Sequence, residues 1–331
     1  MAVASTFIHN NLEVMNRNTA TKVNPTNLLV NMHITDHGSD WLWAAFSVFL
    51  LLTIIHLLLF LYGNFRKPGV KNSLLVIPLF TNAVFSVFYF TYASNLGYAW
   101  QAVEFQHAGT GLRQIFYAKF VAWFVGWPAV LALFEIVTST VLDRIEENPN
   151  IFKKFFLIFQ TWLVKFIFVE IYVLGLLIGS IIFSTYKFGY FTFAVFFQLL
   201  LMVWVGRDLH RSFKSPSHSN IANFFLIFFY LVWILYPVAW GLSEGGNVIQ
   251  PDSEAVFYGI LDLITFGLML TILIFFAIKG CDEEFFSKLW QYHVKSEAES
   301  IHENEKAVAE TTSTEAGVVD AEVDNEPQAQ V

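Results

Sequence analysis

Seven long apolar windows constrain this chain more than any other feature of its sequence. A membrane-spanning α-helix needs about 20 consecutive, mainly apolar residues. The windows are continuously apolar rather than alternating, which excludes a membrane β-barrel. The sequence therefore predicts an all-α membrane protein with a seven-helix bundle, whose spans are Trp41–Tyr62, Ser73–Tyr92, Gln114–Val141, Phe155–Phe183, Phe188–Val205, Ile221–Leu242 and Glu254–Ile278.

Composition narrows the class of protein further. Of 331 residues, 56% are hydrophobic and only 14% are charged, about half the charged share of an ordinary soluble domain. We find no phosphate-binding loop, zinc-hydrolase motif or catalytic triad outside the spans, so we expect no enzyme. The net charge is −8, and Ser296–Val331 carries −9 of it, which leaves +1 for the rest. Nucleic acid is excluded as a partner because no large basic surface exists.

The acidic end of the chain should be a disordered tail. Ser296–Val331 has ten acidic residues, one lysine and no aromatic residue, so it has too little apolar surface to repay the entropy of ordering. Its simplest role is a solvating tail, and docking to a basic partner is the alternative. The single cysteine, Cys281, excludes an internal disulfide and a cysteine-based zinc site, and no metal is expected. Cys281 follows the last span and is a candidate for palmitoylation.

Loop charges predict the orientation in the membrane. The loops after spans one, three and five hold nine basic residues, whereas the loops after spans two, four and six hold only Arg113 and Lys187. The positive-inside rule then places the amino terminus outside. No cleavable signal peptide is expected, because the first residues lack a long apolar run. We predict an extracellular segment over 1–40, a transmembrane domain over 41–280 and a cytoplasmic tail over 281–331.

The sixth and seventh spans carry strings typical of one family. The sequence from Trp233 to Glu244, with Tyr236, Pro237 and Trp240, resembles helix six of the microbial rhodopsins. Pro251–Asp262 resembles the entry to their seventh helix, and Ile115–Trp123 followed by Pro128 resembles their third. The resemblance implies a microbial-rhodopsin bundle with the proline-containing third and sixth helices of that fold. It also places Trp123, Trp233, Tyr236 and Trp240 in the aromatic walls of a retinal pocket. Ordinary packing that has filled this pocket is the simpler interpretation, and a non-covalently held retinoid or other apolar ligand is the alternative.

The chemical residues of the rhodopsins are largely replaced. Retinal forms a Schiff base with a lysine one turn after the helix-seven aspartate, and only a primary amine can form that bond. Asp262 falls on the aspartate, and Phe266 falls on the lysine. The proton acceptor falls on Ala122, the donor on Leu133 and the helix-three arginine on Lys119. We therefore expect no covalent retinal, no other cofactor and no light-driven proton pumping.

Six further blocks resemble the opsin-related membrane proteins of yeasts. These blocks are His33–Thr35, Gly38–Trp43, Tyr92–Gly97, Arg113–Lys119, Ser184–Tyr190 and Gly246–Asp252. That group includes a stress-induced heat-shock protein of the plasma membrane, reported to restrain the proton-pumping ATPase. The resemblance implies a non-photoactive, non-enzymatic stress-response protein of the plasma membrane that regulates or stabilises other membrane proteins, with the ATPase as a partner. The alternative is an ion or proton channel or transporter that uses the remaining vestibule.

Ionisable residues inside the spans are the remaining candidates. Intramembrane charges need partners, so we predict a buried ion pair between Lys119 and Asp262, more simply structural than functional. Glu244 and Glu254 fall on the outer glutamates of the rhodopsin proton-release group and are expected to be solvated loop acids. Glu135 lies toward the cytoplasmic side. Lys165 and Glu170 do not face each other along one helix, so each should pair with another helix or snorkel.

Overall fold

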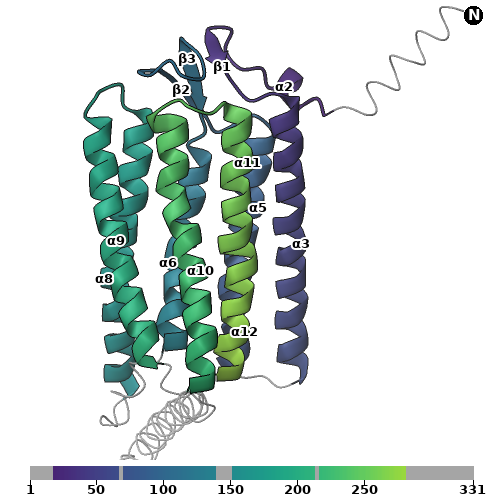
Figure 1. The fold of residues 1–331 in the computed structure, drawn as a ribbon. Helices are drawn as coiled ribbons and strands as arrows, with labels where there is room; N and C mark the ends of the chain where they lie inside the picture. Colours follow the sequence, from purple (N-terminus) through teal and green to yellow (C-terminus); the bar gives the residue numbers. More distant parts are fainter. Residues whose placement is uncertain (1–17, 67–69, 139–150, 213–215, 281–331) are drawn as a thin grey trace, which may run out of the picture. The chain divides into compact units, whose positions relative to one another are not determined.

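The described part of the chain is a bundle of long helices. In the computed structural model (Figure 1), residues 18–66, 70–138, 151–212 and 216–280 are described. Within these ranges, seven helices are long and apolar enough to cross a membrane, and this confirms the predicted fold class. Six of them correspond to α3 (Asp36–Arg66), α5 (Val76–Ala93), α6 (Ala118–Thr138), α8 (Ile151–Ile181), α9 (Lys187–Ser212) and α10 (Pro216–Trp240), and the seventh runs from α11 (Pro251–Asp262) into α12 (Leu270–Gly280).

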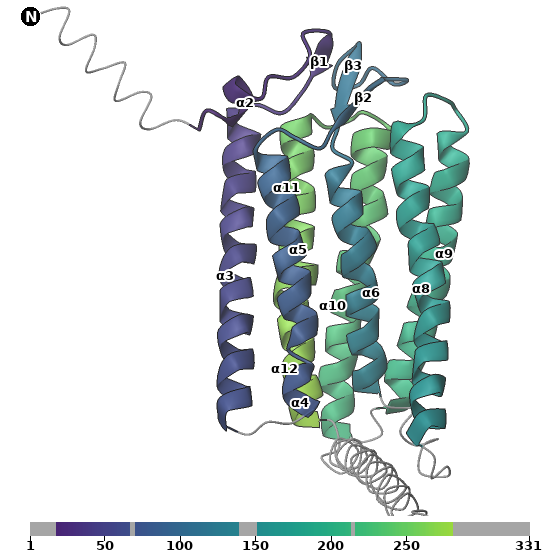
Figure 2. The ribbon, with the colours of Figure 1, turned by 180° about the vertical axis from the view of Figure 1, so that it is seen from behind.

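The helices follow one another around the bundle in chain order. α3 packs on α5, α5 on α6, α6 on α8 and α8 on α9. α10 contacts both α9 and α11, and α11 returns to α3, which closes the ring (Figure 2). α6 is the most enclosed of the described spans, with 72% of its apolar window buried, against 17% for α3. Side chains on α6 therefore line the interior of the bundle.

A small sheet covers one end of the bundle, which we call the sheet end. It consists of β1 (Val30–Met32), β3 (Leu112–Ile115) and β2 (Ala99–Ala102), in that order, with β1 parallel and β2 antiparallel to β3. Short helices α2 (Ala20–Val23) and α4 (Val70–Ser73) complete the described elements. The sequence did not predict the sheet, and the third span begins at Ala118 rather than Gln114. α12 ends at the opposite end, which we call the far end (Figure 1).

Two π-helical turns interrupt the last two spans. η1 (Gly241–Gly245) continues α10, and η2 (Leu263–Met269) joins α11 to α12. A π-turn holds an extra residue per turn, so it changes the direction of the side chains that follow. η1 carries Glu244 and η2 carries Phe266, two of the predicted site positions.

Some predictions lie outside the described residues. These are residues 1–17 of the predicted extracellular segment and the predicted tail, at 281–331, which includes the palmitoylation candidate Cys281. Within the described residues, α3 begins at Asp36, five residues before the predicted span. An acidic first turn suits the positive end of the helix dipole, which explains why the helix extends into polar sequence.

Candidate functional site

The interior holds three polar or aromatic layers along α6. Lys119, Trp123, Trp127 and Glu135 all project from this helix and are buried. At 1.5 Å per residue, Lys119 and Glu135 are separated by about 24 Å along the helix axis. The layers therefore lie at the sheet end, in the middle and toward the far end.

The first layer is a buried group of four charges, which we call the sheet-end cluster: Arg113, Lys119, Glu244 and Glu254. The Lys119 Nζ lies 2.5 Å from Glu244 Oε1 and also forms an ion pair with Glu254. Arg113 Nη2 lies 2.6 Å from Glu254 Oε2. All four side chains are no more than 2% exposed, so the two cations and two carboxylates neutralise one another in the interior.

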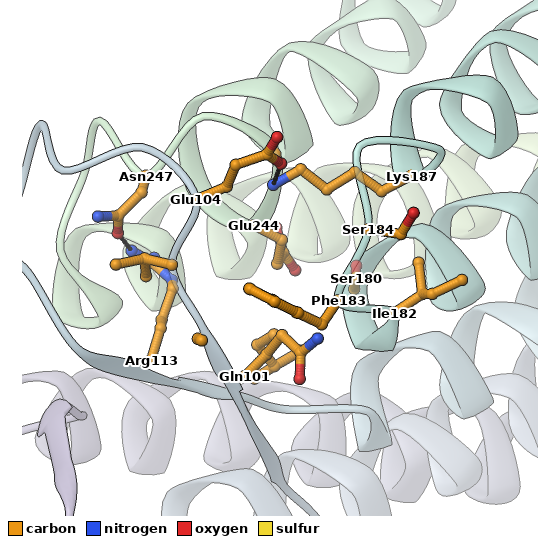
Figure 3. Close-up of a pocket in the computed structure, with 14 residues that line it drawn as sticks. Gln101, Glu104, Arg113, Ser180, Ile182, Phe183, Ser184, Lys187, Glu244 and Asn247 are labelled. Carbon is orange, nitrogen blue, oxygen red and sulfur yellow. Dashed lines mark hydrogen bonds and ion pairs between the residues drawn. The ribbon is translucent and has the colours of Figure 1, made fainter.

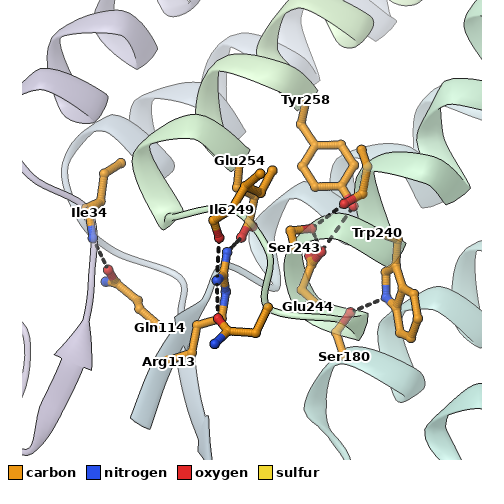
Figure 4. A network of polar contacts seen from close by, with 12 residues as sticks. Ile34, Arg113, Gln114, Ser180, Trp240, Ser243, Glu244, Ile249, Glu254 and Tyr258 are labelled. Carbon is orange, nitrogen blue, oxygen red and sulfur yellow. Dashed lines mark hydrogen bonds and ion pairs between the residues drawn. The ribbon is translucent and has the colours of Figure 1, made fainter. Parts of the chain in front are cut away.

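Backbone and aromatic groups hold the sheet-end cluster in place, as Figure 4 shows in part. Arg113 Nη1 donates 2.7 Å hydrogen bonds to Asn247 Oδ1 and to the Ile249 carbonyl. Glu244 Oε2 accepts hydrogen bonds from Ser243 and from the Tyr258 hydroxyl. The Lys119 ammonium lies 4.2 Å from the centroid of the Tyr258 ring, within the range of a cation–π contact. The cluster thereby joins β3, α6, η1 and α11.

Two predictions about these residues are wrong. Lys119 does not pair with Asp262, and Glu244 and Glu254 are not solvated loop acids. Side chains on a helix lean toward its amino terminus, so Lys119 in the first turn of α6 reaches toward the sheet end and away from Asp262. The η1 turn and the first turn of α11 direct the two glutamates inward. Arg113 was not a predicted site residue, because its role depends on the unpredicted strand β3.

Asp262 lies in the middle layer and is held by neutral donors. Its Oδ2 accepts a 2.7 Å hydrogen bond from the Tyr89 hydroxyl. Its Oδ1 accepts hydrogen bonds from Trp123 Nε1, at 2.8 Å, and from the Tyr236 hydroxyl, at 2.9 Å. The residue is 1% exposed. Three helices, α5, α6 and α10, thus supply the hydrogen bonds that a buried carboxylate requires.

Stacked rings fill the space next to Asp262. The Phe266 ring lies 4.3 Å from the Phe85 ring and 5.2 Å from Trp127, measured between centroids. Trp127 also stacks on Trp233 at 4.9 Å. We call these four residues the aromatic layer. Offset-stacked and edge-on rings at these separations are in van der Waals contact.

The aromatic residues predicted from the resemblance divide into three places. Trp123 and Tyr236 contact each other at 5.2 Å and hold Asp262, while Trp233 belongs to the aromatic layer. Trp240 lies elsewhere, because its Nε1 donates to Ser180 Oγ at 2.8 Å and its ring stacks on Phe191. Trp127 was missed, although its spacing of four residues from Trp123 places both on one face of a helix. Ala122 and Leu133 are fully buried apolar residues.

The third layer, toward the far end, is a buried triad of Glu135, Lys165 and Asp208. The Lys165 Nζ forms an ion pair with Glu135 and lies 2.8 Å from Asp208 Oδ2. The ammonium also lies 5.6 Å from the centroid of the Trp204 ring. The triad joins α6, α8 and α9, and it confirms the prediction that Lys165 pairs with other helices. Glu170 is buried, and its carboxylate oxygens have no hydrogen-bond partner among the described residues.

Comparison with known proteins identifies the family. The family model for bacteriorhodopsin-like proteins matches residues 39–276. The chain belongs to the bacteriorhodopsin-like family. It is 37% identical over 264 residues to the 30 kDa heat shock protein of Saccharomyces cerevisiae. The alignment covers 77% of this chain and 76% of that protein. It is 38% identical over 269 residues to the opsin-like protein carO of Fusarium fujikuroi, with coverage of 77% and 80%.

Solved light-driven ion pumps share the fold. A light-driven proton pump from Leptosphaeria maculans superposes with a TM-score of 0.59 at 19% identity, over 74% of this chain and 96% of that one. Halorhodopsin, a light-driven chloride pump, superposes with a TM-score of 0.60 at 15% identity, over 75% and 98%. At these identities, the match establishes the seven-helix architecture and not the activity. Family membership confirms the resemblance predicted from the sequence.

Among the described residues, no group of three or more histidine, cysteine, aspartate or glutamate side chains is arranged to hold a metal ion. Apart from Glu170, the ionisable site residues described above are paired with each other or hydrogen-bonded to aromatic side chains.

Proposed function

We propose that this chain is a non-photoactive, opsin-like stress-response protein of the plasma membrane, without enzymatic activity and without covalent retinal. The aromatic layer is the observation that supports the absence of covalent retinal. Phe266, at the position of the retinal lysine, has no amine, and its ring contacts Phe85 and Trp127. Stacking of Trp127 on Trp233 leaves no room for a polyene between those two rings. The buried lysines Lys119 and Lys165 are each held by two carboxylates.

Incubation with retinal tests this part of the proposal. Purified full-length protein, mixed with all-trans retinal, should develop no red-shifted absorption band that borohydride can trap. A retinal-binding microbial rhodopsin, treated in parallel, is the positive control. A trapped band in the wild-type protein would show that a lysine reaches the chromophore, and the proposal would fail.

Similarity to a heat shock protein supports the proposed role in the stress response, which we propose is regulatory. The chain resembles a protein named for heat shock over three-quarters of its length. We propose that it acts through helix or tail contacts with another membrane protein, and that the proton-pumping ATPase is the first partner to test. Deletion should alter ATPase activity, intracellular pH or survival in cells stressed by heat, acid or ethanol. If all three quantities stay unchanged, this part of the proposal is wrong.

Ion or proton conduction is the alternative function. The buried charges of the sheet-end cluster and the far-end triad favour it, since intramembrane ionisable residues are often functional. The aromatic layer argues against it, because apolar rings lie between the two charged groups. Proteoliposomes carrying a pH gradient distinguish the two functions. A leak that Asp262→Asn abolishes favours conduction, and an intact gradient favours regulation.

A further inference from the structure

A polar cavity opens at the sheet end, away from the aromatic layer. Its walls come from β2, β3, the end of α8, the start of α9 and η1, and its volume is about 20 Å³, enough for one water-sized occupant. Figure 3 shows Arg113, Glu104, Lys187 and Glu244 around it. The cavity therefore gives outside access to one side of the sheet-end cluster.

The charges buried around this cavity balance only when the partly exposed Glu104 is counted with them. Within the sheet-end cluster, Arg113 and Lys119 neutralise Glu244 and Glu254. Lys187 adds one further positive charge, and its side chain is only 9% exposed. The only carboxylate paired with Lys187 among the described residues is Glu104, whose Oε2 lies 3.3 Å from Nζ. Without Glu104, the buried groups would carry a net charge of +1, which is costly away from water.

Glu104 is the replaceable member of this group. It lies in the loop after β2, and its side chain is 27% exposed, three times as much as that of Lys187. Lys187 is fixed in contrast, since its ammonium lies 5.5 Å and 5.2 Å from the ring centroids of Phe105 and Phe188. The carboxylate can turn outward into solvent, while the ammonium stays in the wall of the cavity.

A second donor in the wall lacks an acceptor. Arg113 lines the cavity and is 2% exposed, yet its buried Nε has no hydrogen-bond partner among the described residues. A buried donor without an acceptor is unfavourable, so an anion in the cavity next to Arg113 would be stabilised by its uncompensated N–H group. Glu244, the other carboxylate in the wall, has its charge compensated by Lys119 at 2.5 Å.

We propose that this cavity binds one small monovalent anion, chloride or a short carboxylate such as acetate, at the Lys187 ammonium, with Arg113 in the wall of the same cavity. The anion takes the place of the Glu104 carboxylate, which turns outward. Glu104 is therefore a built-in competitor, and the occupant is about the size of the carboxymethyl end of the Glu104 side chain or smaller. The site lies at the sheet end and is separate from the retinal-pocket positions.

Thermal unfolding of the purified full-length protein tests the site. The melting temperature is measured while chloride or acetate replaces gluconate, a bulky anion, at constant ionic strength. A ligand that binds only the folded state raises the melting temperature in a saturable way. We expect Glu104→Gln to bind chloride or acetate at least tenfold more tightly than the wild type, because the competing carboxylate is gone. Asp40→Asn, which removes an exposed acid, is the matched control and should behave as the wild type.

Lys187→Met should remove the anion dependence altogether. If that variant does not fold, the comparison of Glu104→Gln with the wild type still decides. A Glu104→Gln protein whose melting temperature is the same in chloride, acetate and gluconate would overturn the proposal. Equal affinities in Glu104→Gln and the wild type would also overturn it, because they exclude competition by Glu104.

Discussion

At the scale of single residues, Gly126 and Phe266 depend on each other. A Cβ atom at position 126 would lie 2.6 Å from a ring carbon of Phe85 and 2.8 Å from a ring carbon of Phe266. Both distances are well below van der Waals contact. The absence of a side chain on α6 is thus what allows Phe266 to fill the position of the retinal lysine.

Gly126→Ala should therefore destabilise the protein even though alanine favours helices. Overpacking a filled core costs about 1–3 kcal/mol, more than the gain in helix propensity of about 1 kcal/mol. Gly189→Ala in α9 is the matched control, since an added Cβ there meets nothing within 4 Å. Melting temperatures of the two variants should fall for Gly126→Ala and stay level or rise for Gly189→Ala. Equal values would mean that the aromatic layer is loosely packed.

The sheet-end cluster gives a second prediction at this scale. Lys119→Met leaves Glu244 and Glu254 with only one cation between them, and breaking a buried ion pair costs about 3–5 kcal/mol. Adding Glu244→Gln removes the excess negative charge, so the double variant should recover much of the lost stability. Adding Asp262→Asn to Lys119→Met should recover less, because Asp262 is bound by neutral donors. A better rescue by Asp262→Asn would restore the pairing predicted from the sequence.

The sequence predicted which residues lie inside the bundle better than it predicted which residues they contact. The motif around Asp262 placed it correctly inside the bundle, and the spacing to Phe266 identified the missing amine. The partner of Lys119 could not be predicted, because it depends on the direction of a long side chain and on a π-turn. Arg113 was missed because a residue in a loop gives no periodic signal, and only the fold brings it within 2.6 Å of Glu254.

At the scale of elements, each group of buried ion pairs joins three or more helices or strands. The far-end triad connects α6, α8 and α9 through Lys165. The sheet-end cluster connects β3 and α6 to α11. Helices in lipid gain little from hydrophobic burial against each other, so polar contacts and close packing fix their arrangement.

Lys165→Met should therefore loosen three helices at once. Two buried carboxylates lose the lysine that they share, and we expect a loss of about 3–5 kcal/mol in the free energy of unfolding. Arg207→Gln is the control, because its side chain is 54% exposed and lies 3.7 Å from Asp208, where an ion pair is worth at most about 1 kcal/mol. Detergent-solubilised protein can be compared by thermal unfolding. Similar small losses in both variants would show that the triad is solvated.

The elements that the sequence did not predict are too short to show a periodic pattern of apolar residues. The strands of the sheet are three or four residues long, too short for an alternating pattern to be distinguished from a loop. One of their pairings joins Val30 to Leu112, so no local turn signal marks it. The long helices were predicted because each carries many apolar residues, although their ends shifted where polar residues could extend the helix.

At the scale of the whole molecule, the seven spans follow from composition, while orientation rests on the charge of the loops. Nine basic residues fall in the predicted loops after spans one, three and five, whereas Arg113 and Lys187, from the loops after spans two and four, are both buried in ion pairs at the sheet end. The charges of these two residues are thus compensated within the folded protein. The charge available to interact with the cytoplasmic leaflet therefore differs between the two ends even more than a count of residues indicates.

This asymmetry predicts that the sheet end faces outward. Cys281 is the only cysteine, so a Cys281→Ser background allows single cysteines to report their side of the membrane. Leu28, at the sheet end, is fully exposed, and Phe65, near the far end of α3, is 88% exposed. A membrane-impermeant maleimide added to intact cells should label Leu28→Cys, and should label Phe65→Cys only after permeabilisation. The opposite pattern would place the basic loops outside, and it would put the cavity beside Lys187 in contact with cytoplasmic rather than external anions.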